Sequence, residues 1–449
     1  MAERMIHLGL FLRGPGHHLA AWRHPGSSSL AGMDFRTQLA VVRAAEESRF
    51  DMVFLADGLA VRNFEQGPHI TSRMGHGVHL EPLTLLSALA VHTERIGLAA
   101  TASTSYTAPF HVARQFASLD HLGGGRAAWN LVTSVSVAEA RNFGFDEHLP
   151  HAERYARAES YVDVVRKLWD SWSDDAFTAD KADGQYFDPQ RVFPAGYRDE
   201  HFAVEGPLNI ARSPQGHPVI VQAGSSAAGQ KLAARTADVV FTAQPNLESA
   251  IAFRTGLRQQ VEKAGRPADA LKVLPGLMPV VGDTEEEAQR AFAELQGLID
   301  PEVGMAMLSR LLGGVDLSGL SPDAPLPELG GSNAIQSRLE LIRGIARSGR
   351  LTIRQTYTAI AGARGHHTVI GTPETVAGVM EQWFRAGGAD GFIVLPALYP
   401  QHFEKFASQV VPILQERGLF RKEYAGSTLR SHLGIPRKEH FTSIDRHVA

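Results

Sequence analysis

The chain has 449 residues, 44% of them hydrophobic and 20% charged, so most of it is expected to fold around a sizeable core. Its formal net charge of -4, with acidic and basic residues interspersed, argues against nucleic acid as a partner. Because the chain contains 0 cysteines, disulfides, thiolate catalysis, iron–sulfur clusters and cysteine-ligated zinc are excluded.

No segment has the length and apolarity of a membrane span, which needs about 20 residues. The first residues lack the apolar stretch and the small-residue cleavage site of a signal peptide. We therefore expect no membrane partner and a cytoplasmic location.

Eight short apolar runs alternate with longer segments of helical periodicity, the pattern of repeated strand–helix units. The expected strands span residues 6–12, 52–57, 96–104, 127–133, 219–223, 239–243, 273–281 and 392–396. The expected helices span residues 35–48, 82–93, 111–121, 153–171, 226–236, 247–264, 375–387 and 402–417. This count, and the absence of a glycine-rich dinucleotide loop after the first run, favour a closed (β/α)8 TIM barrel of the α/β class over an open sheet.

Two insertions interrupt the alternation within a single expected domain of residues 1–425. Residues 174–217 are expected to form a hairpin or loop, and residues 283–372 to form helices that flank a lid loop. Both insertions are expected on the C-terminal rim of the barrel. Residues 426–449 form a polar C-terminal tail that is expected either to pack on a partner subunit or to stay flexible.

In such a barrel the residues directly after each strand face the active site. Asp57 closes the second expected strand and could accept a hydrogen bond from a ligand or cap a turn. The third strand leads into residues 101–106, where five hydroxyl side chains, including Ser103, could bind a ligand or simply mark a strand-to-helix junction. Asn130, an amide among apolar neighbours, needs partners, either the polar edge of a bound ring or the adjacent strands.

The fifth strand leads through residues 223–229, Ala-Gly-Ser-Ser-Ala-Ala-Gly, directly into a helix. Small residues at Gly224, Ser225 and Ser226 allow the backbone to approach an anion, and the helix start supplies free N–H groups for a phosphate. The alternative is an ordinary serine cap of that helix.

Three residues at the start of the fourth expected helix, His151, Arg154 and Tyr155, lie at positions i, i+3 and i+4 and can share one face. They could form an anion clamp or belong to an ordinary amphipathic face.

Histidine pairs at residues 17–18 and 366–367 suggest a metal site. The sequence has neither the His-x-His motif at the end of the first strand nor a helical His-Glu-x-x-His motif. We therefore predict no metal site and keep a metal-dependent barrel hydrolase as an alternative only.

Taken in order, these segments resemble the bacterial-luciferase-like flavin monooxygenases, and within them the nitrilotriacetate/dibenzothiophene-sulfone monooxygenase family. The resemblance extends from about residue 5 to about residue 420. It rests on Ala-Trp-Arg-His-Pro at 21–25, Phe-Leu-Ala-Asp at 54–57, residues 101–106 with 109–114, residues 120–126, Trp-Asn-Leu-Val-Thr-Ser at 129–134, Asn-Phe-Gly at 142–144, residues 151–155 and Gln-Ala-Gly-Ser-Ser at 222–226.

The resemblance implies a two-component monooxygenase that uses reduced FMN (FMNH2) and O2 to oxidise a small organic substrate at sulfur, nitrogen or carbon. A separate NAD(P)H:flavin reductase would supply the FMNH2, and the protein would form a homodimer or homotetramer. At matching positions Asp57, Ser103 and Asn130 would contact the isoalloxazine or ribityl part of the flavin. The phosphate would be held by a set without acidic residues, namely His151, Tyr155, Gly224, Ser225 and Ser226.

Because the cofactor carries the oxygen chemistry, no catalytic nucleophile is expected. The candidates for polarising the substrate or moving a proton are His17, His18 and His366. Substrate choice is expected to depend on residues 14–33, the 174–217 insertion and the lid. The alternatives on the same scaffold are a deazaflavin-dependent luciferase-like oxidoreductase and a non-catalytic flavin-binding protein, the second disfavoured by the intact phosphate-loop residues.

Overall fold

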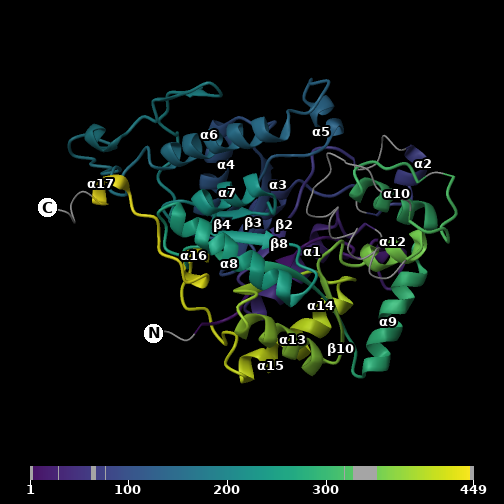
Figure 1. Ribbon diagram of the computed structural model, residues 1–449. Helices are drawn as coiled ribbons and strands as arrows, with labels where there is room; N and C mark the ends of the chain where they lie inside the picture. The colour runs from purple at the N-terminus through teal and green to yellow at the C-terminus, as the bar shows by residue number, and fades with distance from the viewer. Residues whose placement is uncertain are drawn as a thin grey trace.

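A parallel sheet that closes on itself forms the centre of the molecule (Figure 1). The computed structural model describes residues 4–28, 30–61, 67–75, 77–317, 319–326 and 351–444. Eight strands follow one another around the barrel, and the last pairs with the first: β1 (His7–Phe11), β2 (Met52–Leu55), β3 (Gly97–Ser103), β4 (Ala127–Val132), β7 (Val219–Gln222), β8 (Val239–Thr242), β9 (Lys272–Val281) and β11 (Gly391–Val394). The predicted strands and the (β/α)8 fold class are confirmed.

Helices cover the outside of the barrel: α1 (Phe35–Glu47), α3 (Pro82–Ala90), α4 (Pro109–Leu122), α6 (His151–Trp169), α7 (Ala227–Thr236), α8 (Leu247–Lys263), α13 (Pro373–Arg385), and α14 (Gln401–Lys405), which continues through a π-helical turn (Phe406–Val410) into α15 (Val411–Glu416). α13 shows why these segments form helices. Its apolar residues recur at helical spacing and are buried, and the side chain of Thr372 caps its first turn by accepting from the Thr375 N–H.

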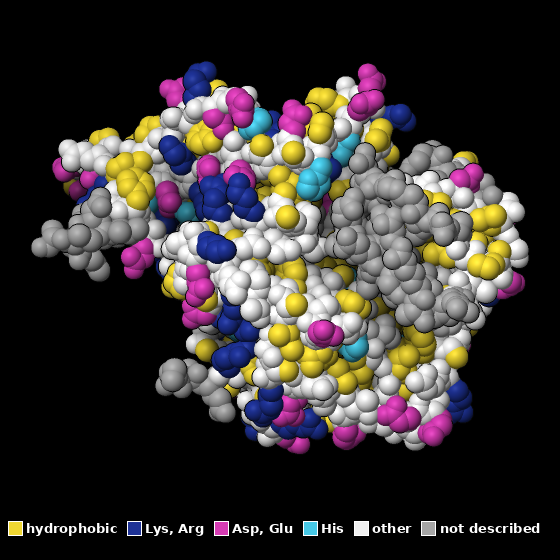
Figure 2. Space-filling model, in the orientation of Figure 1, with side chains coloured by type: hydrophobic (Ala, Val, Ile, Leu, Met, Phe, Trp, Pro, Cys, Tyr) yellow, Lys and Arg dark blue, Asp and Glu magenta, His cyan; other side chains and the backbone are white. Residues whose placement is uncertain are grey.

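The shorter helices are α2 (Pro68–Thr71), α5 (Val137–Asn142), α16 (Leu429–His432), α17 (Phe441–Ile444) and two 3-10 turns (Ala21–Arg23 and Pro189–Arg191). In the described part of the chain, no helix is long and apolar enough to cross a membrane. Figure 2 shows acidic and basic side chains interspersed over one face of the molecule, as the sequence suggested.

The second predicted insertion contains α9 (Glu285–Gly297), α10 (Pro301–Leu311) and α12 (Ile353–Ala361), and also a strand that the sequence analysis missed, β10 (His367–Gly371). β9 is 10 residues long, and β11 pairs only with its Gly276 and Leu277. β10 pairs in parallel with Leu277–Val281 and so covers the edge that β9 would otherwise expose. Residues 327–350, which include much of the expected lid loop, lie outside the described residues.

The first insertion, residues 174–217, does not lie on the C-terminal rim where we expected it. It joins the end of α6 to the start of β7, and a loop of that kind belongs to the N-terminal end of the barrel. Its hairpin, β5 (Tyr197–Arg198) with β6 (Ala203–Val204), packs against α6, where Phe202 contacts Tyr161. After the hairpin, Gln215 Nε2 donates a hydrogen bond to Asp120 Oδ1 at 2.7 Å, near the start of β4. The insertion is therefore too remote from the mouth to select substrates.

Buried aspartates fasten the N-terminal end of the barrel. Asp51 precedes β2 and accepts the Leu8 N–H of the neighbouring strand at 2.7 Å, and Asp238 precedes β8 and accepts the Ile220 N–H at 3.0 Å. Asp390 precedes β11 and accepts the Val273 N–H at 3.0 Å. Each of these carboxylates ties the start of its own strand to the start of another.

The described part of the expected C-terminal tail packs on this same end of its own chain. Leu429, Leu433 and Ile435 belong to the hydrophobic cluster of the barrel interior. Arg430 pairs with Asp238 at 2.9 Å, and Arg421, just before the tail, pairs with Asp51. The sequence analysis did not predict that this segment packs on its own chain, because the residues that anchor it are spaced among polar ones.

We expect Arg430→Met to lower the free energy of unfolding by about 3–5 kcal/mol, because it leaves the buried Asp238 carboxylate without its main countercharge. Burial alone would raise the pKa of Asp238, but Arg430 and Lys438 hold it at about 2, below its ordinary value of 3.8. The stabilisation is therefore complete above about pH 4 and is lost as the pH falls toward 2.

Urea unfolding at pH 7 measures this loss. The double variant Asp238→Asn/Arg430→Met should recover part of it, since it no longer buries an uncompensated charge. If Arg430→Met lowers the free energy of unfolding by less than about 1 kcal/mol, the Asp238–Arg430 pair does not hold the C-terminal segment in place.

Candidate active site

The candidate site lies at the C-terminal ends of the barrel strands, where enzymes of this fold place their chemistry. β1 leads into Arg13, β2 into Asp57 and β7 into Gly224, while β3 ends at Ser103. α2, α10 and α12 lie on this side of the barrel and α16 and α17 on the opposite side (Figure 1).

Three phenylalanines fill the barrel interior. The ring centroids of Phe11, Phe54 and Phe241 are 5.5, 6.1 and 5.3 Å apart. All three side chains are buried, so they form an apolar floor that leaves no room for bulk water beneath the mouth.

Two of the three predicted catalytic histidines meet above this floor. His366 stacks on Phe241 at 4.9 Å, and the ring of His17 stands edge-on to Phe11 at 5.3 Å. The two histidine rings are 6.0 Å apart. His366 fits there only because position 276 is a glycine: a Cβ on Gly276 would lie 2.2 Å from the imidazole Nδ1.

The third histidine, His18, is placed differently. It is fully buried, and its Nδ1 accepts the Ala20 N–H at 3.1 Å. Burial lowers its pKa to about 4 against the opposing effect of Gln296. His18 is therefore neutral at physiological pH and has the partners of a residue that shapes the loop.

The side-chain oxygen of Asn130 is buried, and no described residue donates a hydrogen bond to it. Thr101 donates its hydroxyl to the Leu55 carbonyl at 2.7 Å, so the same oxygen must accept from Asn130 Nδ2, also at 2.7 Å. This orientation leaves Asn130 Oδ1 without a hydrogen-bond partner among the described residues, and Gln222 Oε1 on β7 shares that condition. Buried amide oxygens of this kind call for a donor from a ligand or water.

Ser103 and Asp57 have protein partners at the mouth. Ser103 Oγ lies 2.8 Å from Ser134 Oγ, and it accepts the Ser105 N–H at 3.1 Å. Asp57 Oδ1 lies 2.9 Å from His79 Nε2. His79, which the sequence analysis did not select, therefore joins the site through Asp57.

The structure brings the predicted phosphate residues together from two helices. A Cβ on Gly224 would lie 3.0 Å from the Gly229 Cα and 3.4 Å from the Tyr155 hydroxyl, so the loop passes close to both α7 and α6. The His151 and Tyr155 rings are 4.7 Å apart. Ser226 caps α7 by accepting the Gly229 N–H at 3.2 Å. The alternative interpretation of this serine as a helix cap is therefore confirmed.

Arg154 takes a structural part in this region. Its guanidinium donates to the Leu149 carbonyl at 2.9 Å and to the Ser134 carbonyl, so it braces the loop after β4. Burial, followed by the Arg154 charge, lowers the pKa of His151. A bound anion would oppose that shift.

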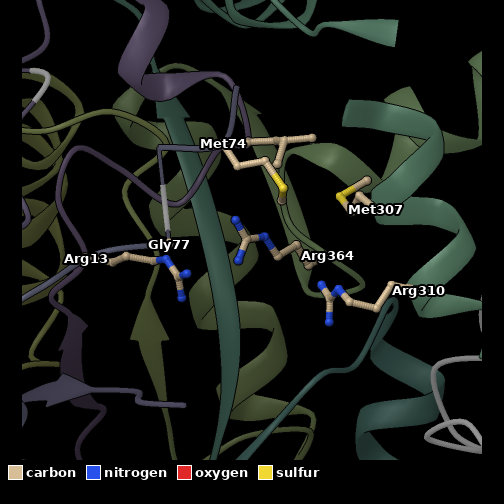
Figure 3. A pocket seen from close by; sticks show the side chains of 7 residues that line it. Arg13, Met74, Gly77, Met307, Arg310 and Arg364 are labelled. Carbon is tan, nitrogen blue, oxygen red and sulfur yellow. The ribbon is translucent and has the colours of Figure 1, made fainter. Parts of the chain in front are cut away.

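Sequence reasoning did not select three arginines that line one pocket at the mouth, Arg13, Arg310 and Arg364 (Figure 3). Arg13 could have been found, because it directly follows the first strand. Arg310 and Arg364 lie in the second insertion, and no spacing in the sequence indicates that they meet.

Fold and site together define an α/β barrel with a loop of small residues between its fifth barrel strand and the next helix, and with buried amide oxygens at its mouth that lack a partner among the described residues. The family model for luciferase-like monooxygenases matches residues 15–391. The chain belongs to this family and is a flavin-dependent monooxygenase.

Named relatives match along almost the whole chain. N-acetyl-S-(2-succino)cysteine monooxygenase from Bacillus subtilis is 49% identical over 96% of this chain and 97% of its own length. Nitrilotriacetate monooxygenase component A from Aminobacter aminovorans is 46% identical over 97% of this chain and 98% of its own. The crystal structure of DmoA from Hyphomicrobium sulfonivorans superposes with a TM-score of 0.89 at 31% identity, covering 99% of this chain and 96% of that one.

We expect Asn130→Leu to change the free energy of unfolding of the flavin-free protein by about 1 kcal/mol or less, because the loss of the hydrogen bond to Thr101 is offset by the removal of a buried oxygen that has no partner among the described residues. The same variant should bind FMN about tenfold more weakly or worse, since it loses a hydrogen bond to the ligand. Flavin fluorescence titration and urea unfolding measure the two effects. Strong destabilisation with unchanged FMN affinity would make Asn130 a purely structural residue.

Proposed function

We propose that the chain is the oxygenase component of a two-component system: it takes FMNH2 from a separate NAD(P)H:flavin reductase and uses O2 to oxidise a small organic substrate at sulfur, nitrogen or carbon. Family membership along the barrel supports this. A relative that is named as component A supports a separate partner protein.

The observation that carries the flavin assignment is the convergence of α6 on the loop after β7. In the proposal His151, Tyr155, Ser225 and Ser226 bind the phosphate, and Gly224 lets the backbone approach it. Helix geometry adds N–H groups at the start of α7 that have no partner inside the helix. No member of this set is acidic, as a dianion requires.

The remaining cofactor contacts are proposed for residues deeper in the mouth. Asn130 Oδ1 can accept from a ring N–H of the flavin, since it has no partner among the described residues. Ser103 and Asp57 would bind the ring or the ribityl chain with the groups that they now direct toward Ser134 and His79.

Reduced flavin, when bound, supplies the electrons that activate O2. The protein's own part is to orient the ring and exclude water, and the phenylalanine floor serves the second purpose. His17 and His366 lie above that floor and are proposed to hold or move a proton near the substrate. The neutral, buried His18 is proposed to keep the loop in shape instead.

The family match favours this function over a metal-dependent barrel hydrolase. A deazaflavin-dependent hydride transfer remains the second candidate, because the barrel scaffold alone does not distinguish the two cofactors. Anaerobic titration with FMNH2 and with a reduced deazaflavin separates them, and tighter binding of the deazaflavin would contradict the proposal.

The direct test supplies chemically reduced FMN and 18O2 without any reductase. The substrates offered are nitrilotriacetate and N-acetyl-S-(2-succino)cysteine, after the two relatives. We expect a product that carries one 18O atom, formed only when both FMNH2 and O2 are present. Product formation without flavin would contradict the mechanism.

We expect Ser225→Asp to weaken FMN binding roughly a hundredfold or more, because it sets a negative charge against the phosphate. Ser249→Asp is the matched control: it makes the same change in the first turn of the neighbouring helix α8 and should leave FMN affinity unaltered. Riboflavin, which lacks the phosphate, should bind the Ser225 variant and the unaltered protein alike. Equal FMN affinity in all three proteins would remove the loop from the site.

A further inference from the structure

The short helix α5, which lies between β4 and α6, is tied to the loop after β2 by two hydrogen bonds. Glu139 Oε1 accepts the Leu59 N–H at 2.9 Å, and Asn142 Nδ2 donates to the Leu59 carbonyl at 2.8 Å. Both backbone groups of Leu59 are therefore held by side chains that lie about one turn apart on the same helix. Leu59 follows Asp57, one of the proposed flavin contacts, by two positions.

The other carboxylate oxygen of Glu139 holds the loop after β4. Its Oε2 accepts the Val135 N–H at 3.2 Å and the Ser136 N–H at 3.1 Å. The second of these bonds belongs to a capping box, in which Ser136 and Glu139 each accept a backbone N–H of the other. Glu139 is only 7% exposed, so three backbone N–H groups take the place of water around its charge.

The loop after β4 needs such support because the backbone of Ser134 is strained. Its φ of 54° lies in the left-handed region, which residues other than glycine rarely adopt. Ser134 is buried, and its hydroxyl lies 2.8 Å from that of Ser103, another proposed flavin contact. Strain of this kind persists only where neighbouring contacts enforce it, and the two N–H groups that Glu139 holds here follow Ser134 directly.

A role as a helix cap does not account for the second contact of Glu139. The capping box uses Oε2, whereas the bond from Leu59 to Oε1 joins residues that are 80 positions apart in the chain. β2 and β4 do not pair with each other, because β3 lies between them. No direct strand pairing therefore sets the distance between the loops that follow β2 and β4, and Glu139 links them across β3.

We propose that Glu139 is a positioning residue for the flavin ring: its carboxylate fixes the loop after β2 relative to the loop after β4, and so sets Asp57 against the Ser103–Ser134 pair. The inference rests on the proposed function, since it concerns the residues that would hold the flavin there. Glu139 makes no proposed contact with the flavin and acts through the two loops. Loops that are already held in their binding conformation lose less freedom when the ligand binds, so the link raises flavin affinity.

Glu139→Gln separates the link from the cap, because glutamine has one acceptor oxygen and one NH2 group in place of two oxygens. The oxygen can keep the capping box, which takes glutamine as well as glutamate. The NH2 group then faces the Leu59 N–H, and that hydrogen bond is lost. In the flavin-free protein we expect hydrogen exchange to become about tenfold or more faster in a peptide that contains Leu59, and to stay within about twofold in α5. Mass spectrometry measures both.

The same variant should bind FMN about tenfold more weakly, because the loop after β2 must now be ordered during binding. Riboflavin, which has the ring and the ribityl chain but no phosphate, should be weakened by the same factor. The visible absorption spectrum of bound FMN should also change, because the surroundings of the ring change. Fluorescence and absorption titrations measure these effects.

The charge that Glu139→Gln removes would by itself act in the opposite direction. Burial lowers the pKa of Arg154, and the Glu139 carboxylate is among the groups that oppose this shift, so its charge reaches the start of α6. His151 and Tyr155 of the proposed phosphate site lie on that helix. Removal of a negative charge from this region would favour a bound dianion. Weaker FMN binding by this variant is therefore an effect of the loops and not of the charge.

Glu46→Gln is the matched control. Glu46 also accepts three backbone N–H groups, but at the N-terminal end of the barrel, from Glu94, Arg95 and Ile96 before β3. This control should leave FMN affinity within about twofold of the original.

Asn142→Ala is a second test variant, because Asn142 is exposed and its replacement leaves the capping box intact. It removes the hydrogen bond to the Leu59 carbonyl and should weaken FMN binding about threefold.

Unchanged exchange at Leu59 in the Glu139→Gln protein overturns the inference. Faster exchange there with unaltered affinity for FMN and riboflavin also overturns it, since Glu139 is then a helix cap only. If α5 exchanges faster as well, the cap has been lost too, and Asn142→Ala decides: unaltered FMN affinity in that variant overturns the inference.

The proposed function fails in a different way. If the unaltered protein does not bind FMN, the proposed function is overturned and this role of Glu139 with it. If the unaltered protein and all three variants bind FMN equally well, only the role of Glu139 is removed and the flavin assignment stands.

Discussion

Buried ion pairs hold the N-terminal end of this barrel together. At the N-terminal end the chain supplies both signs: Asp238 pairs with Arg430, and Asp51 pairs with Arg421. At the mouth, Arg13, Arg310 and Arg364 line one pocket. The ion pairs serve stability, and the candidate site lies at the opposite end, in line with the usual division of a (β/α)8 barrel between its two faces.

The ion-paired N-terminal end of the barrel determines the geometry of its C-terminal end. Each aspartate that precedes a strand accepts an N–H from another strand, so the strands cannot slide past one another without exposing a buried carboxylate. Strand register then places Thr101 directly opposite Asn130 on β3 and β4. The orientation of the Asn130 amide, and the unsatisfied oxygen that it presents, follow from that pairing and from the Leu55 carbonyl beyond it.

Sequence reasoning succeeded where one local signal was sufficient. The eight strands followed from apolar runs, and the loop at Gly224 was recognisable because small residues stood between a strand and a helix. It failed where partners were distant in the chain. β10 forms because β9 extends beyond the end of β11, its neighbour in the barrel, and the C-terminal segment packs through Arg430 onto a carboxylate 192 residues away. The arginine pocket combines a residue of the loop after β1 with two residues of the second insertion. None of these three features produces a periodic pattern in the sequence.

The proposed flavin contacts and the second insertion belong to different parts of the fold. Of the proposed flavin contacts, Asp57, Ser103, Asn130 and Gly224 lie on or shortly after barrel strands, whose pairing holds them in place, while His151 and Tyr155 lie on α6. Two of the three pocket arginines, Arg310 and Arg364, lie instead in the insertion between β9 and β11, outside the barrel wall. Neither residue takes part in the strand pairing that positions Asn130. The strands can therefore keep the proposed cofactor contacts while the insertion, where the sequence analysis expects part of the substrate choice, varies.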